Sequence, residues 1–229
     1  MAATTDLRAW LTPADFIDSD APAIAEFART AVGDATDDVE RAIRLYYAVR
    51  DSIVYTPYCD FHSPDTYRAS AVLAKGSGFC VGKAALLAAA ARAIGIPARV
   101  GFADVRNHLC TPRLRALMGT DTFFYHGYTE LYLRGRWVKA TPAFDRGLCE
   151  KFGVHALPFD GVADSLFQPH DTHGRRHMEY LRDRGPHADV PVADIIATFE
   201  RGYPNFVRSG AAAAPATQFR SEAEQTRGE

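Results

Sequence analysis

The segment that most restricts the fold is a strongly helical, largely apolar run over residues 81–94, which starts directly after Cys80. A Gly-Ser-Gly turn at 76–78 precedes this run. A Gly-Ile-Pro stop at 95–97 ends it, in the usual order in which glycine and then proline terminate a helix. The alanine-rich surface permits close packing against neighbouring elements. The pattern therefore predicts a helix with Cys80 at its N-terminus.

Periodicity predicts further elements on both sides of this helix. They are helices over 22–28, 37–53 and 192–201, and strands over 98–105, 124–133 and 136–141. The last two strands form an antiparallel hairpin, with Arg134 and Gly135 at its turn. Helices followed by antiparallel strands indicate an α+β fold. Residues 106–121 and 142–191 show no clear pattern.

The domain organisation predicted from these elements is one domain over residues 1–208. Its core covers about 37–145, and residues 146–208 form a C-terminal extension. The segment 209–229 consists of small and polar residues without apolar periodicity, so we expect a disordered tail.

Composition excludes several classes of protein. The formal net charge of -2 and the pI near 6.4 lack the basic excess of a nucleic-acid-binding surface. No apolar run is long enough to cross a bilayer, and the first residues lack the basic and apolar regions of a secretory signal. We therefore expect a cytoplasmic protein without a membrane partner. None of the four cysteines forms a C-x-x-C pair, and we expect no cofactor and no metal. The oligomeric state is not predicted.

Cys80 and His126 are the candidate reactive residues. A helix N-terminus favours the thiolate form of cysteine, and together with a neighbouring imidazolium it can lower a thiol pKa from about 8.5 to roughly 3.5–7.5. The alternative for Cys80 is a buried cysteine packed at the start of a helix. His126 lies in the predicted hairpin on the face shared with Glu130, where a rigid strand suits a general base. The chain has eight histidines, so a histidine downstream of Cys80 is not by itself evidence for a catalytic base; its position in the strand is.

Two segments resemble the transglutaminase-like superfamily: GSGFCVGKAALLAAAARAIGIPARVGF and FYHGYTELYLRGRWVKATP. The resemblance covers about residues 53–141, and residues 142–204 resemble an extension found in a bacterial branch of such proteins. It implies a papain-like α+β core, in which the nucleophile at a helix N-terminus packs against an antiparallel sheet. Cys80 would then be the nucleophile and His126 its general base and later its acid.

The resemblance implies lesser roles for three other residues. Glu130 corresponds to an acid that is structural rather than catalytic. Tyr55 and Tyr58 are candidates for a side-chain donor that assists the oxyanion.

The sequence departs from the family pattern at the position of the third catalytic residue. The family usually has W-V-x-x-D-P-T, with an aspartate that orients the histidine, and this chain has Thr141 at that position. The Thr141 hydroxyl could accept the imidazole N–H, Asp145 could bend back into the role, or the site could be inactive. We prefer Asp145, because a carboxylate is the better partner for an imidazolium. The predicted catalytic set is thus Cys80, His126 and Asp145.

The predicted activity is cysteine-dependent acyl transfer or hydrolysis of an amide or peptide bond through a thioester acyl-enzyme. A protease or amidase is preferred over a protein crosslinker, with a peptide or a small amide or ester as substrate. One alternative is an inactive binding module on the same fold. A second is a metal-dependent hydrolase that uses His170, Asp171, His173, His177 and Glu179, although their spacing matches no standard zinc motif.

Overall fold

The computed structural model describes residues 6–208 and 214–226. Its α-helices are α1 (Pro22–Val32), α2 (Asp38–Ser52), α3 (Ala69–Lys75), α4 (Cys80–Ala93), α5 (Pro112–Met118), α6 (Arg146–Phe152), α7 (Val192–Gly202), α8 (Pro204–Arg208) and α9 (Ala216–Thr226). The strands are β1 (Val54–Tyr55), β2 (Ser77–Gly78), β3 (Ala98–Asn107), β4 (Thr122–Leu133), β5 (Arg136–Ala140) and β6 (Met178–His187), and short 3-10 helices cover Arg8–Trp10 and Pro64–Thr66.

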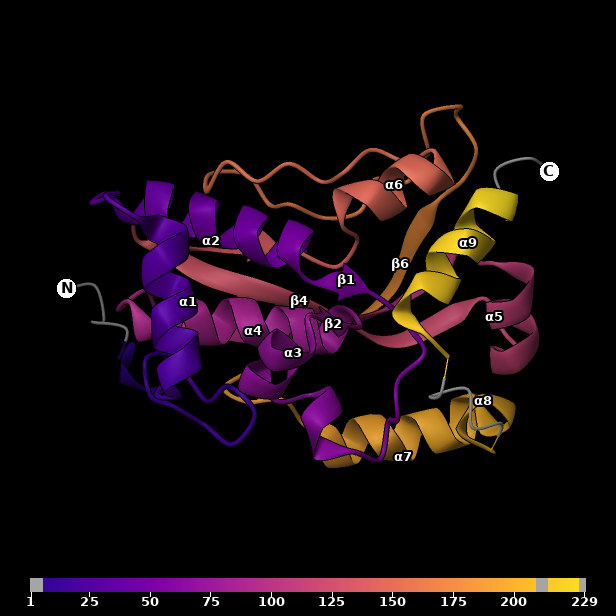
Figure 1. The fold of residues 1–229 in the computed structure, drawn as a ribbon, viewed down its shortest axis with the longest axis horizontal. Helices are drawn as coiled ribbons and strands as arrows, with labels where there is room; N and C mark the ends of the chain where they lie inside the picture. Colours follow the sequence, from indigo (N-terminus) through magenta and orange to yellow (C-terminus); the bar gives the residue numbers. More distant parts are fainter. Residues whose placement is uncertain (1–5, 209–213, 227–229) are drawn as a thin grey trace.

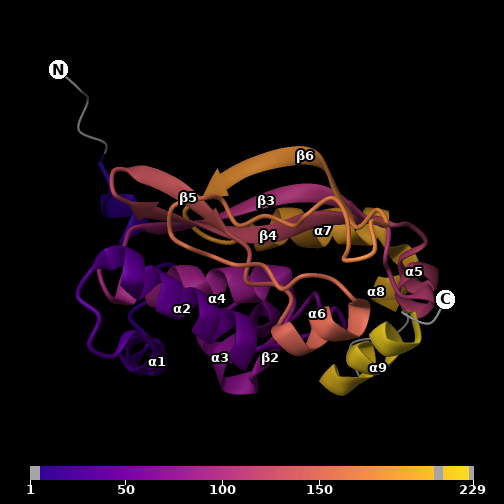
Figure 2. The same cartoon turned by 90° about the horizontal axis from the view of Figure 1, so that it is seen from above.

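Four antiparallel strands in the order β5-β4-β3-β6 form the main sheet, and β1 and β2 make a separate short parallel pair. Helices α1 to α4 cover one face of this sheet, so the core has a helical layer and a sheet layer (Figure 2). Helices α7 and α8 lie along one side of the molecule, and α6 and α9 lie near one end (Figure 1). This arrangement confirms the predicted α+β class.

Helix α4 is the centre of the core. Every residue from Cys80 to Arg92 is buried, and the helix packs against α1, α2, α3, β3 and β4. Its alanines allow these neighbours to approach from all sides, which a helix with one apolar face would not permit. Lys83 is fully buried, and its ammonium group donates to the carbonyl oxygens of Arg50 (2.9 Å) and Ile53 (2.6 Å) near the C-terminus of α2.

The predicted hairpin is present, with a bulge that the alternation did not show. Arg134 and Gly135 have φ values of 49° and 82°, as a tight two-residue turn between twisted strands requires. Near the start of β4, Ala103 pairs with His126 and Val105 with Phe123, so β4 carries one extra residue. The simple alternation of side chains along this strand is therefore interrupted before His126. Bulges of this kind redirect side chains near sites.

The two segments without a clear pattern contain regular structure. Residues 106–121 include α5, and residues 142–191 include α6 and β6. Most side chains of β6 are exposed, because it is an edge strand that pairs only with β3. It therefore lacks the apolar alternation from which strands are predicted. The extension thus supplies the fourth strand of the main sheet. The helix predicted over 192–201 is confirmed as α7.

The expected disorder of the C-terminal segment is wrong for residues 214–226. They include α9, whose Phe219 and Ala223 are buried four residues apart on one face. Arg220 pairs with Asp145 at 2.7 Å. Two apolar residues among small polar ones were too few to show amphipathic periodicity. Residues 209–213 and 227–229 lie outside the described part of the chain.

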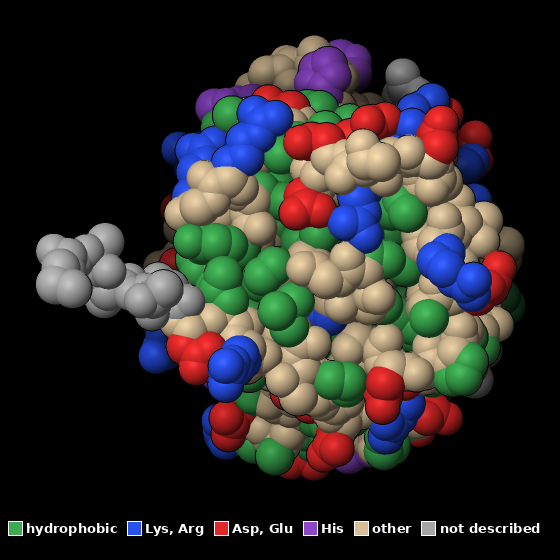
Figure 3. Space-filling model, turned by 90° about the vertical axis from the view of Figure 1, so that its left-hand side faces the viewer, with side chains coloured by type: hydrophobic (Ala, Val, Ile, Leu, Met, Phe, Trp, Pro, Cys, Tyr) green, Lys and Arg blue, Asp and Glu red, His purple; other side chains and the backbone are tan. Residues whose placement is uncertain are grey.

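Surface and helix properties bear on the predicted partners. On the face shown in Figure 3, basic and acidic side chains lie interspersed. In the described residues, no helix combines the length and apolar character needed to cross a bilayer. The cytoplasmic location stays a prediction.

Candidate active site

Close contact between α4 and β4 fixes the position of Cys80. A Cβ atom on Gly127 would lie 2.8 Å from the Cα atom of Val81 and 3.2 Å from the carbonyl oxygen of Cys80. Real Cβ atoms do not come that close to backbone, so only glycine lets the strand touch the first turn of the helix. This contact brings the backbone N–H of Gly127 to the sulfur of Cys80.

Burial raises the pKa of the Cys80 thiol to about 11, although the backbone N–H groups of Gly127, Val81 and Cys80 act in the opposite direction. The helix N-terminus therefore has the predicted effect, but the desolvation cost of the thiolate exceeds it. The other three cysteines are also buried, and burial raises their thiol pKa values further, to about 12. Burial thus raises the pKa of all four thiols above the ordinary value.

His126 follows the bulge of β4 and is 5% exposed. The preceding residue, Tyr125, has a φ of 53°, an uncommon value for a residue with a side chain. Burial lowers the pKa of His126 to about 4, so the imidazole is neutral near pH 7. Its ring lies 5.2 Å from the ring of Phe167, centroid to centroid.

Cys80 and His126 line the same small cavity, which has a volume of about 40 Å³. The other lining residues are almost all apolar or aromatic: Tyr55, Pro57, Phe61, Phe79, Leu114, Met118, Phe123, Phe124, Phe199, Tyr203 and Phe206. No Lys, Arg, Asp or Glu side chain is among them. The hydroxyl of Tyr203 is engaged, since it donates to the carbonyl oxygen of Thr122 and accepts from the N–H of Phe124.

Helices α5, α7 and α8 supply much of this wall, which the sequence did not predict. The apolar periodicity of α7 indicated a helix with a buried face, but it did not indicate that the face would border the cysteine.

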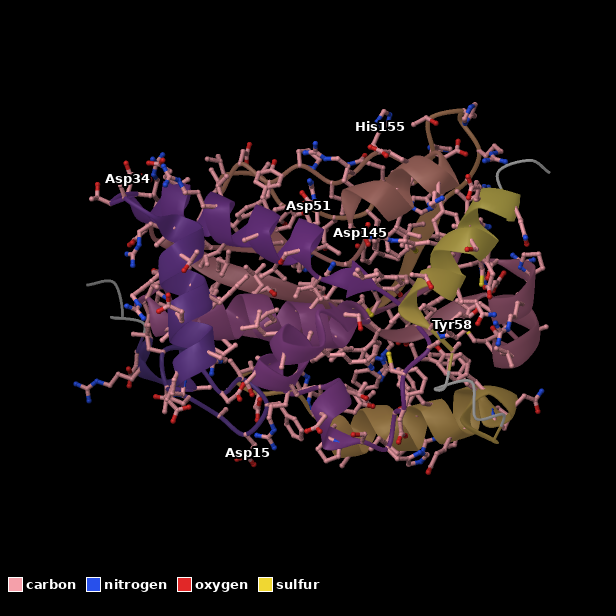
Figure 4. The ribbon with its side chains drawn as sticks, viewed as in Figure 1. Asp15, Asp34, Asp51, Tyr58, Asp145 and His155 are labelled. Carbon is pink, nitrogen blue, oxygen red and sulfur yellow. The ribbon has the colours of Figure 1, made fainter. Side chains whose placement is uncertain are left out.

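The structure separates the two tyrosine candidates. Tyr55 lines the cavity, and burial raises its pKa well above the usual value, so its phenol stays protonated and can donate. The hydroxyl of Tyr58 instead donates to Glu222 of α9 at 2.5 Å. Figure 4 shows Tyr58 beside the start of α9. Of the two, only Tyr55 lines the cavity together with Cys80.

Asp145 has a different set of partners from the one predicted. It is 1% exposed and caps α6 by accepting the N–H of Leu148 at 2.9 Å. It also accepts the N–H of Tyr55 at 3.1 Å and pairs with Arg220 at 2.7 Å. Figure 4 shows it at the start of α6 near the end of α2. None of its recorded hydrogen bonds in the described chain goes to His126, so the structure does not support Asp145 as the residue that orients the imidazole.

Thr141 is buried, and its hydroxyl oxygen has no hydrogen-bond partner within the described residues; the same holds for Nε2 of His126. Glu130 pairs with Arg99 at 2.5 Å, in a buried contact between β4 and β3. That contact fits the structural role implied for this acid.

No residue of the 170–179 segment lines the cavity around Cys80. In the described chain, no group of three or more His, Cys, Asp and Glu side chains is arranged to hold a metal ion. Asp171 accepts hydrogen bonds from the backbone of His173 and Arg175 and pairs with the Arg175 guanidinium. His170 and Glu179 instead line a separate cleft of about 450 Å³, which also borders Phe167.

Comparisons with known proteins agree with this architecture. The family model of the transglutaminase-like superfamily matches residues 25–142, which are 118 of the 229 residues. The chain therefore belongs to the transglutaminase-like superfamily, which confirms the resemblance. No curated protein matches the chain.

One solved structure with a similar fold is that of a putative cysteine protease from Cytophaga hutchinsonii, with a TM-score of 0.51 and 18% identity. The match covers 84% of this chain and 50% of that one, so the chain spans about half the length of the protein it resembles. At this identity the likeness concerns the fold. The family match and the likeness in fold thus agree with each other.

Proposed function

We propose that the chain transfers or hydrolyses acyl groups through a thioester on Cys80, with His126 as general base and then acid. The observation that carries the proposal is that the two residues border one apolar cavity at the N-terminus of a buried helix. In this arrangement the superfamily's cysteine chemistry has a nucleophile, a base and a water-poor environment.

The reaction starts from a neutral pair, because burial raises the pKa of the thiol and lowers that of the imidazole. As Cys80 Sγ attacks the carbonyl carbon, the thiol proton moves to His126. The backbone N–H groups at the start of α4 and the phenol of Tyr55 donate to the developing oxyanion. The tetrahedral intermediate expels an amine or alcohol, which takes the proton from His126. Water, deprotonated by His126, then attacks the thioester carbonyl. The C–S bond breaks, Cys80 Sγ takes the proton back from His126, and the acid is released.

The substrate we propose is a peptide or a small amide or ester with an uncharged, apolar acyl group. A charged group in this cavity would lose its hydration and find no side chain of opposite charge in the lining. Water is the preferred acceptor, which makes the chain a hydrolase rather than a protein crosslinker.

The test is acylation of the protein by p-nitrophenyl acetate, followed by mass spectrometry of peptides. We expect one acetyl group on Cys80, none on the other three cysteines, and no stable adduct in Cys80→Ser. His126→Ala should slow acylation by about 10²–10⁴-fold, the usual contribution of general acid–base catalysis. The monosuccinyl ester should react much more slowly than the acetyl ester, because its acyl group carries a charge.

An inactive binding module remains the competing function. It would leave Cys80 no more reactive toward the ester than Cys59, Cys110 and Cys149, and indifferent to His126→Ala. That result would overturn the proposal.

A further inference from the structure

The cavity around Cys80 is too small to hold a whole substrate. Its volume is about 40 Å³, and a single water molecule already needs about 10–15 Å³ of such space. A short acyl group fits there, but the amine or alcohol that leaves does not fit beside it. In the proposed reaction His126 protonates this leaving group, so the leaving group must extend from the imidazole into space outside the cavity.

A cleft of about 450 Å³ lies on the other side of one aromatic ring from the His126 imidazole. The ring is that of Phe167, which lines the cleft and also packs on His126, with 5.2 Å between the two ring centroids. Small-molecule sites usually have volumes of about 300–1,000 Å³. The other lining residues of the cleft are mostly polar: His108, Pro169, His170, Arg176, Met178, Glu179 and Tyr180. The cleft therefore has the room and the polarity that the cavity lacks.

Arg176 is the residue of this lining that is best suited to bind a ligand group. Glu179 has partners of its own, Arg106 and His108, at 3.4 Å each. Within the part of the chain that the structure describes, the guanidinium of Arg176 forms no hydrogen bond or ion pair. The cleft thus offers a positive charge to an anionic group, whereas the cavity around Cys80 is lined by side chains without formal charge.

The turn that carries Arg176 is fixed from both sides. Asp171, whose side chain is fully buried, accepts the backbone N–H of Arg175 at 2.8 Å and pairs with its guanidinium at 2.7 Å. The carbonyl oxygen of His177 accepts the N–H of His108 at 2.9 Å, which ties the turn to the end of β3. A site on ordered backbone loses little conformational entropy when it binds a ligand.

We propose that this cleft is the leaving-group subsite of the Cys80–His126 pair and that Arg176 binds a carboxylate in it. The substrate is then an apolar acyl group joined to an amino acid, as in an N-acyl amino acid or a short peptide with a free C-terminus. When the tetrahedral intermediate collapses, the C–N bond breaks and the amine nitrogen takes the proton from His126. The carboxylate of the departing amino acid stays on the Arg176 guanidinium, whose N–H groups match it in a bidentate arrangement. This inference rests on the proposed function.

The first experiment compares two esters with the same acyl group. The leaving group of p-acetoxybenzoate carries a carboxylate, and that of its methyl ester does not. Each second-order rate constant for acylation of Cys80 is divided by the hydroxide-catalysed rate of the same ester, which corrects for leaving-group reactivity. We expect wild type to prefer the carboxylate ester, and Arg176→Gln to reduce this preference by about 5- to 20-fold, as for one partly exposed charge-assisted contact. The methyl ester should react equally with both proteins, and Arg176→Lys should recover part of the preference.

Two controls distinguish a leaving-group subsite from general attraction of anions. Arg182→Gln removes another exposed arginine of β6 that is outside the lining of the cleft, and it should leave the preference unchanged. The monosuccinyl ester of p-nitrophenol carries its carboxylate on the acyl side, so Arg176→Gln should not slow its reaction. An equal loss in either control would overturn the subsite. Equal corrected rates for the two acetyl esters, with Cys80 still acylated by p-nitrophenyl acetate, would overturn this inference alone.

Binding of the product gives a readout that does not depend on activity. We expect p-hydroxybenzoate to shift the side-chain N–H signal of Arg176 in nitrogen-15 NMR, assigned by its loss in Arg176→Gln, and methyl p-hydroxybenzoate to leave it in place. Absence of acylation in wild type would overturn the proposed function. In that case, a shift caused by the carboxylate alone would still support a carboxylate site in the cleft, and no shift at millimolar concentration would refute it.

Discussion

Replacing Asp145 by alanine should destabilise the protein without abolishing the chemistry at Cys80. The cap of α6 contributes about 1 kcal/mol, and the N–H of Tyr55 donating to a buried carboxylate contributes about 1.5–3 kcal/mol. The ion pair with Arg220, whose side chain is 31% exposed, adds about 0.5–1 kcal/mol after discounting for solvent. Together these give a loss of about 3–5 kcal/mol.

A loss of this size corresponds to a fall in Tm of roughly 6–20 °C for a chain of this length. Arg220→Ala removes only the ion pair and should lower Tm by about 1–4 °C. Asp164→Ala is a matched control, because Asp164 is an exposed aspartate that accepts one backbone N–H, from Lys139. It should cost no more than about 1 kcal/mol.

The assay combines thermal unfolding with acylation by p-nitrophenyl acetate at a temperature at which every variant is folded. We expect Asp145→Asn to acylate within a few-fold of wild type. A loss of 100-fold or more in Asp145→Asn, with Arg220→Ala fully active and little change in Tm, would refute the structural role and restore Asp145 as the residue that orients His126.

Four further predictions follow from burial and close contact. The Cys80 thiol should titrate with a pKa near 11, measured as the part of the thiolate absorbance that Cys80→Ser lacks. A midpoint below pH 8 would contradict the conclusion that burial outweighs the helix N-terminus. Gly127→Ala should push α4 away from β4, lower the free energy of unfolding in urea by about 1–3 kcal/mol and suppress acylation. The control Gly135→Asn, at the exposed hairpin turn, should leave acylation unchanged. Burial lowers the pKa of His177 to about 4, so on acidification the unfolded state binds the proton first. The free energy of unfolding should therefore fall as pH drops from about 6.5 to 4. His177→Phe should make this fall smaller, and an unchanged slope in the variant would contradict the prediction. Burial also lowers the pKa of Lys83 from 10.5 to about 7, so the free energy of unfolding should increase as pH rises from about 7 to 10.5. In Lys83→Met this increase should be absent, and urea midpoints measured across the range test it.

The nucleophile and its helix could be predicted because their signals are local. The glycines before Cys80, the alanine run and the Gly-Ile-Pro stop are consecutive, and a helix is built from contacts within a few residues. The hairpin after residue 122 is also local, since Arg134 and Gly135 determine its turn. These elements, with the family pattern around Cys80 and His126, were enough to predict the α+β class and the superfamily.

Three features of the site depend on contacts between distant residues. The aromatic wall from α7 and α8, the anchoring of Asp145 by Arg220, and the packing of the Phe167 ring on the His126 ring each join segments far apart in the chain. Asp145 shows the difficulty most clearly: its position after the hairpin suggested a catalytic carboxylate, and only the packing of α6 and α9 supplied its partners.

The sequence by itself determined which segment carries the nucleophile and which strand carries the histidine, because periodicity and turn residues act over a few positions. Tertiary structure alone decided the protonation states, the character of the cavity and the partners of each polar group. Desolvation depends on every atom packed around a group, and one extra residue in β4 was enough to change which side chains share its face.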